Sequence, residues 1–197
     1  MEKDHSKSKK TKNIFTEYFR WPLIVLVVSL TLSFAFSFFS ELTLKGANLI
    51  VAILVILVFM VVSIITDIVG VAFTAAVEVP FRAMAARKIK GAKESIILIN
   101  NADKVASIMA DIFGDICGIL SGAAGAVVAT KLSAGVVDDI KLVLIASIVS
   151  AVIVGIIIFG KAMGKKLAIE NCDKIVLMIG KLVYVFTFGK LSIKNKN

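Results

Sequence analysis

The sequence predicts an all-α integral membrane protein with four transmembrane helices and basic amphipathic helices beside the membrane. Hydrophobic residues make up 58% of its 197 residues, and the mean hydropathy of +0.95 lies well above that of water-soluble domains. The apolar residues gather in four long stretches that are separated by charged segments. Acidic residues lie inside two of these stretches, which makes their role in a membrane the central question.

Each apolar stretch is near or above the roughly 17 to 25 residues that a transmembrane helix needs. The stretches cover residues 23–39, 48–76, 105–129 and 140–160. A fifth apolar segment, 175–188, is only about 14 residues long and carries Lys181, so we expect it to lie at the interface or to pack against protein. The sequence therefore predicts four membrane spans.

This pattern divides the chain into four segments. Residues 1–20 form a charged cytoplasmic tail, 21–47 an additional N-terminal transmembrane helix and loop, 48–190 the main transmembrane domain, and 191–197 a second tail. Trp21 and Pro22 mark the interface and the first helical turn of the N-terminal span. Because no small-residue cleavage site follows this span, we expect an uncleaved anchor helix.

The distribution of lysine and arginine predicts the orientation. Basic residues precede the first span, lie between the second and third, and follow the fourth, whereas the other two loops are nearly neutral. By the positive-inside rule both termini are expected in the cytoplasm, with the protein in the plasma (inner) membrane. The net charge of +9 then reflects topology and attraction to an anionic inner leaflet, so nucleic acid is not needed as a partner.

The second span carries polar residues at helical spacing. Ser63, Asp67, Gly70 and Thr74 share one face, and Glu78 follows a turn later. Pro80 is expected to end or kink this helix. From 81 to 99, apolar and basic positions alternate with a helical period, which predicts a basic amphipathic helix or helix pair on the inner leaflet, or alternatively a linker helix packed on the bundle.

The third span holds a pair of acids. Ser107, Asp111 and Asp115 are spaced four apart, so they are expected on one helix face that Gly118 and Gly122 continue. An acid at the bilayer centre costs about 2.5 to 3.5 kcal/mol, and two carboxylates one turn apart need a cation, a shared proton or a basic side chain. Oxygen-rich acidic surroundings suit a hard cation such as magnesium, or a proton or sodium.

Enzyme chemistry finds no support in the sequence. His5 lies in the basic tail, and Cys117 and Cys172 lie too far apart in the predicted topology to pair. No Gly-rich phosphate loop follows a strand, and no histidine or cysteine cluster has the spacing of metal ligands. We therefore expect a protein that is not an enzyme.

The order of elements resembles the transmembrane domain of the CorB/CorC and cyclin M magnesium transporters. The stretches that carry the resemblance are F-T-A-A-V-E at 73–78, R-K-I-K-G-A-K at 87–93, D-I-F-G-D at 111–115 and F-G-K-A-M-G-K-K-L-A-I-E-N at 159–171. They match, in order, the family's small-residue and Glu motif, basic hairpin, paired asparagines and Gly-Glu-x-x-Pro-Lys motif. The resemblance covers residues 48–190, and the 197 residues contain no CBS pair.

The resemblance implies a dimeric module that binds a cation through hydroxyl, amide and carboxylate oxygens. By position, the candidates are Ser63, Glu78, Asp111, Asp115 and Gly160. The sequence departs from the family where Lys161 replaces its glutamate and Gly164 its proline, and where acids replace the paired amides.

Lys161 can be interpreted in two ways. It can pair with Asp111 or Asp115 in place of a bound ion, since a buried charge pair is tolerated where a single charge is not. Its position at the end of the span instead favours a side chain that extends into the cytoplasm and leaves the acids free.

The predicted function is binding or transport of a divalent cation, magnesium, through an acidic intramembrane site. The metal-site residues are Ser63, Asp67, Glu78, Asp111 and Asp115, with Gly160 and Lys161 gating the site or neutralising its charge. The alternative is a non-transporting structural or regulatory membrane protein in which Lys161 neutralises the acids. A proton- or sodium-coupled carrier is a third possibility. The expected partners are the bilayer and a second copy of the chain.

Overall fold

The computed structural model describes residues 2–134 and 138–187, with side chains from Arg20 onward. Within these ranges the chain forms helices and no strands, which confirms the all-α prediction. Four helical segments are long and apolar enough to cross a membrane: Arg20–Leu44, Leu49–Ala75, Ala102–Leu132 and Asp139–Glu170. They coincide with the four predicted spans. The tail predicted at 191–197 lies outside the described residues.

The first helix, α1 (Glu2–Leu44), supplies most of a compact unit of its own, Met1–Leu42. Helix α1 extends through the segment predicted as a tail, and Pro22 lies inside it instead of in its first turn. The prediction of a helix start at Pro22 is therefore wrong. Lysine is a good helix former, and a proline in an apolar helix removes only one backbone hydrogen bond, so helix continues on both sides of it.

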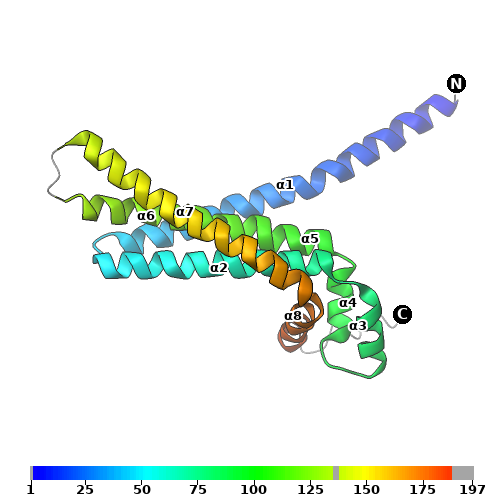
Figure 1. Cartoon of the computed structure of the whole chain (residues 1–197). Helices are drawn as coiled ribbons and strands as arrows, with labels where there is room; N and C mark the ends of the chain where they lie inside the picture. Colours follow the sequence, from blue (N-terminus) through cyan, green and yellow to red (C-terminus); the bar gives the residue numbers. More distant parts are fainter. Residues whose placement is uncertain (1, 135–137, 188–197) are drawn as a thin grey trace. The chain divides into compact units, whose positions relative to one another are not determined.

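The second unit, Thr43–Asn197, contains the three remaining spans. They are α2 (Leu49–Ala75), the continuous run of α5 (Ala102–Ala106), the π-helix η1 (Ser107–Gly114) and α6 (Asp115–Leu132), and α7 (Asp139–Glu170). Helices α2, α6 and α7 pack against one another as a three-helix bundle (Figure 1). Their shared core is made of Ile56 and Met60 from α2, Ala124 and Val128 from α6, and Ile153 and Ile157 from α7.

Three short helices gather at the end of α2: α3 (Glu78–Ala86), α4 (Ala92–Ile99) and α8 (Cys172–Phe186) (Figure 1). Their core joins the fully buried Phe73 of α2 to Phe81 of α3 and Val176 of α8. The predicted pair of helices is found as α3 and α4, and both pack against α2 and α8. Their position on the inner leaflet stays a prediction. Helix α8 is not among the four candidate spans and packs on α4, where the buried Ser95 hydroxyl donates to the carbonyl of Val176 at 3.2 Å, as expected for the fifth apolar segment.

The break after the second span lies earlier than predicted. Helix α2 ends at Ala75, the backbone is extended at Ala76 and Val77, and Pro80 lies in the first turn of α3. A proline is tolerated in a first turn because its missing N–H would have no intrahelical partner there. Pro80 therefore belongs to the start of α3 and does not itself end the span.

Candidate functional site

Two glycines on α7 set how close this helix comes to α2. A Cβ at Gly164 would lie 2.6 Å from Ile68 Cγ1, and a Cβ at Gly160 would overlap Ile64. The buried positions of α7, which are Ile153, Ile157, Gly164 and Ala168, define its inner face. Lys161 lies on the same turn as these glycines, so the close approach brings its side chain to α2. Small residues at helix interfaces in membranes allow this kind of contact.

The inner face of α2 carries the polar residues that helical spacing predicted. Ser63 is fully buried and Asp67 is 8% exposed, whereas Thr74 at the end of the predicted face is exposed. The Ser63 hydroxyl donates to the carbonyl of Gly114 at 2.6 Å. This hydrogen bond joins α2 to the last residue of η1.

The π-helix changes the geometry expected for the third span. Its hydrogen bonds run from residue i to i+5, so the four-residue spacing of Ser107, Asp111 and Asp115 does not follow α-helical geometry there. Gly70 lets η1 approach α2, since a Cβ at Gly70 would lie 2.9 Å from Ala110 Cβ. That Ser107, Asp111 and Asp115 share one face stays a prediction. The close approach expected where Gly122 continues this face is not found, because an added Cβ there would meet nothing within 4 Å.

Asp67, Asp115 and Lys161 form a charge cluster between the three helices of the bundle. The Lys161 ammonium donates a hydrogen bond to Asp115 Oδ1 at 3.2 Å and lies 3.9 Å from Asp67 Oδ1. The Lys161 side chain is 20% exposed. The interpretation favoured by the sequence, in which Lys161 extends away from the acids, is therefore wrong. The glycine contacts explain this, because they bring α7 near enough for the ammonium to reach both carboxylates.

The two acids of the charge cluster differ in environment. The Asp67 side chain is 12% exposed and that of Asp115 is 64% exposed. Asp67 Oδ2 is buried and has no hydrogen-bond partner among the described residues. Two formal negative charges face one positive charge, so the cluster retains a formal charge of −1. Lys161 therefore compensates the acids only in part, and the buried oxygen of Asp67 keeps unused acceptor capacity.

Three predicted metal-site residues lie outside the charge cluster: Ser63, which is hydrogen-bonded to Gly114, and the acids Asp111 and Glu78. Asp111 is exposed on η1, and in the described part of the chain no ion pair joins it to Lys161. Glu78 begins α3, and its carboxylate accepts two hydrogen bonds from the Arg82 guanidinium, at 2.9 and 3.1 Å. This hydrogen bonding to Glu78, together with the charge of the carboxylate, raises the pKa of Arg82 above its ordinary value.

No group of three or more acidic, histidine or cysteine side chains in the described ranges is placed to hold a metal ion. The Ser63 hydroxyl donates its proton to Gly114, and Lys161 occupies one side of both acids. Magnesium prefers six oxygen ligands in near-octahedral geometry, so the conformation described fits a lysine between the acids better than it fits the ion.

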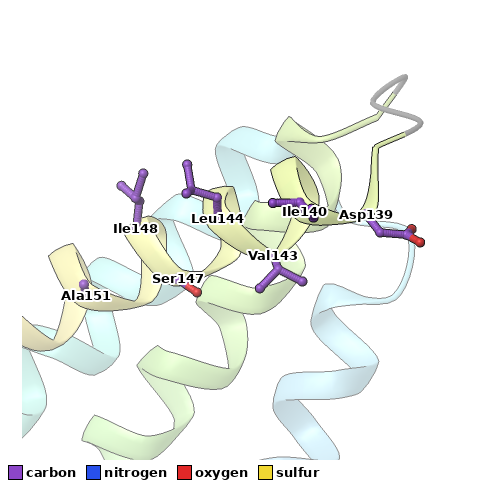
Figure 2. Close-up of a pocket in the computed structure, with 7 residues that line it drawn as sticks. All are labelled: Asp139, Ile140, Val143, Leu144, Ser147, Ile148 and Ala151. Atoms are coloured by element: carbon purple, nitrogen blue, oxygen red, sulfur yellow. The ribbon is translucent and has the colours of Figure 1, made fainter.

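A hollow of about 670 Å³ lies along the first half of α7. All its lining residues come from α7: Asp139, Ile140, Val143, Leu144, Ser147, Ile148 and Ala151 (Figure 2). Figure 2 shows the Asp139 carboxylate directed away from the apolar side chains. This hollow is therefore a mainly apolar surface of one helix, with Asp139 and Ser147 as its polar side chains.

Sequence reasoning missed a buried acid, Glu94 on α4. It is 2% exposed, and its Oε1 has no hydrogen-bond partner among the described residues. In the sequence Glu94 follows Lys93 and appears as one charge of a basic amphipathic helix. No local signal reveals its burial, because α8, some eighty residues away in the chain, packs over α4.

No protein-family model, curated protein or solved structure matches this chain, and its resemblance to the CorB/CorC and cyclin M transporters stays a prediction.

Proposed function

We propose that this chain is a non-transporting structural or regulatory membrane protein in which Lys161 neutralises an acidic intramembrane site. The observation that supports the proposal is the position of the Lys161 ammonium, 3.2 Å from Asp115 and 3.9 Å from Asp67. A lysine there supplies the positive charge that a bound cation would supply in a transporter. The charge cluster then joins α2, α6 and α7 and fixes their register.

The energetics of ions in membranes favour this function. An acid inside a span is costly unless it is paired, and Asp67 is the more buried of the two acids. A cation that entered the site would have to displace the ammonium and leave it without a partner in a low-dielectric region. No covalent chemistry is part of this proposal, and the protein is proposed not to be an enzyme.

A second candidate function is magnesium binding or transport. It is supported by the oxygen atoms and the negative charge of the cluster that Lys161 does not satisfy. Asp67 Oδ2 lacks a hydrogen-bond partner among the described residues, Asp115 is largely exposed, and the formal charge of the cluster is −1. If Lys161 moved toward the end of its span, both carboxylates would become available to a divalent cation as cargo. Asp111, Ser63 and Glu78 would then have to approach the site through a rearrangement of η1 and α3.

The proposal also includes the membrane in which the protein lies, the side on which its termini lie, and its assembly as a homodimer. The net charge of +9 and the placement of basic residues support a plasma (inner) membrane location with both termini in the cytoplasm, against an anionic leaflet. The homodimer is supported by the resemblance alone. Nucleic acid has no part in the proposed function.

Magnesium flux into proteoliposomes that contain a fluorescent indicator tests the two candidates. The comparison uses the wild type, Lys161→Met, Asp67→Asn combined with Asp115→Asn, and the control Lys165→Met, which removes an exposed lysine one turn further along α7. For a non-transporting protein, no variant carries flux above that of empty liposomes. Wild-type flux that the double acid variant abolishes and Lys165→Met preserves would reject the proposal and establish transport. Proton and sodium indicators in parallel experiments test the third possibility.

A further inference from the structure

A cavity of about 340 Å³ with a mixed polar and apolar lining lies where α3 turns into α4. Its charged lining comes from Lys88, Lys90, Lys93 and Glu94, and Tyr184 of α8 closes one side. The backbone turns sharply here, with left-handed φ values of 55° at Lys88 and 86° at Gly91. Position 91 also has no room for a side chain, because a Cβ on Gly91 would lie 2.6 Å from the backbone nitrogen of Lys181. Helix α8 therefore holds the turn and its lysines in place.

The cavity combines exposed cations with one buried anion. The three lysines are exposed, whereas Glu94 is 2% exposed and its Oε1 has no hydrogen-bond partner among the described residues. A buried carboxylate oxygen without a donor is unfavourable. Because Glu94 is one of the residues that line the cavity, its unpartnered oxygen points to a ligand that supplies a donor. The same ligand must carry negative charge to bind the lysines. The ligand therefore contains both an oxyanion and a positively charged hydrogen-bond donor.

The cavity also lies beside the membrane surface. Helix α3 begins three residues after the end of α2, a candidate span, and Figure 1 shows α3 and α4 running across the axis of α2. The turn between them therefore stays near the depth at which the span ends. Lipid headgroups are the ligands at highest local concentration at that depth, and a cavity of this volume falls in the range of small-ligand sites.

We propose that this cavity binds the phosphoethanolamine headgroup of a membrane phospholipid. The phosphate interacts with Lys88, Lys90 and Lys93, and the primary ammonium donates a hydrogen bond to Glu94 Oε1. The site rejects phosphocholine, because a quaternary ammonium has no N–H to donate. It also discriminates against phosphoglycerol, whose neutral hydroxyl makes a weaker hydrogen bond to a carboxylate than an ammonium does.

The test is lipid retention on the purified full chain, measured by native mass spectrometry after incubation with equal amounts of phosphatidylethanolamine, phosphatidylcholine and phosphatidylglycerol. The wild type should retain phosphatidylethanolamine about tenfold over phosphatidylcholine, as expected for one hydrogen bond to a buried charge. Glu94→Met should remove this preference, and Glu94→Gln, which keeps a neutral acceptor, should reduce it. Lys90→Gln combined with Lys93→Gln should lower the retention of all three lipids.

The control is Glu170→Gln, which changes an exposed acid that pairs with Lys166 and should leave the preference intact. Helicity and monodispersity in detergent identify variants that have not folded. If neither Glu94 variant folds, the lipid selectivity of the wild type and the lipid retention of the lysine double variant still test the proposal. Equal retention of the three lipids by the wild type, or an unchanged preference in a folded Glu94→Met, would overturn it. Displacement by soluble phosphoethanolamine at the same concentration as the lipid would overturn the assignment of the ligand to the membrane.

Discussion

The ammonium of Lys161 donates a hydrogen bond to Asp115 Oδ1 across 3.2 Å and thereby joins α7 to α6. The two residues are separated by 46 positions in the sequence, and both belong to helices of candidate membrane spans. The same ammonium approaches Asp67 of α2. One cationic side chain thus connects all three helices of the bundle, and the predictions below test what it contributes.

Removal of the lysine should destabilise the bundle more than removal of the exposed acid. Lys161→Met leaves Asp67 as a largely buried charge without its partner, and we expect a loss of about 1 to 3 kcal/mol, less than for a fully buried pair. Asp115→Asn should cost less than about 1 kcal/mol because that side chain is exposed. Reversible unfolding in mixed micelles measures both. An equal loss of stability in Lys165→Met would show that the effect comes from the change in net charge and not from the contacts of Lys161 in the charge cluster.

The pair Lys161 and Asp67 should be energetically coupled. In a double-mutant cycle with Lys161→Met and Asp67→Asn, the double variant should be more stable than the sum of the single losses predicts, by about 1 kcal/mol. The reason is that Asp67→Asn removes the charge that Lys161→Met would leave uncompensated. The same cycle between Asp67 and Lys165 should give additive losses. Additivity for Lys161 and Asp67 would contradict the assigned contact.

A methyl group at Gly164 should push α7 away from α2. Gly164→Ala places a Cβ 2.6 Å from Ile68 Cγ1, so we expect a loss of about 1 to 3 kcal/mol from overpacking. Ile68→Val in the same chain should recover part of it. Gly155→Ala on the same helix is the matched control, because its Cβ would meet nothing within 4 Å. Equal thermal stabilities of the two alanine variants would refute the close approach.

Loss of the Ser63 hydroxyl should loosen the contact between α2 and η1. Ser63→Ala leaves the carbonyl of Gly114 without this donor, and we expect a cost of about 1 kcal/mol, near the upper part of the range for polar contacts between membrane helices. Ser147→Ala, at an exposed position of α7, is the control. Hydrogen exchange at the amides of η1 should rise in Ser63→Ala alone. Unchanged exchange in both variants would argue against a role for this hydrogen bond.

Both termini should lie on the same side of the membrane. Four spans and the distribution of lysines predict a cytoplasmic location for each end. Fusion of a reporter that is active only in the cytoplasm should give activity at either terminus, whereas a fusion inserted between the third and fourth spans should be inactive. Activity at only one terminus would require an odd number of spans.

The helical elements could be predicted largely from sequence, and their ends less well. The four spans follow from length and hydropathy, because a bilayer demands an apolar helix of a certain length whatever surrounds it. The start of α1 and the end of α2 were placed at the two prolines and differ in the structure. In both cases the backbone tolerates proline at a position where local rules expected a boundary.

The candidate site shows where sequence reasoning stops. Asp67 and Asp115 could be identified as intramembrane acids, since few apolar spans contain such residues. Lys161 could be named as a possible partner, but its position at the end of a span favoured an extended side chain. The close approach of α7 to α2, which brings Lys161 to the acids, could not be predicted. The π-helix at Ser107–Gly114 could not be predicted either, because the apolar pattern of the third span was interpreted with α-helical spacing throughout.

The sequence by itself determined the membrane environment, the helical class and the presence of charged groups inside it, since these depend on the transfer of each segment from water to lipid. Tertiary structure decided which charges meet. Gly160 and Gly164 let α7 approach α2, so Lys161 reaches Asp67 and Asp115, and α8 packs on α4, where Glu94 is buried. Such contacts depend on the fit between surfaces distant in the sequence, and no local pattern encodes that fit.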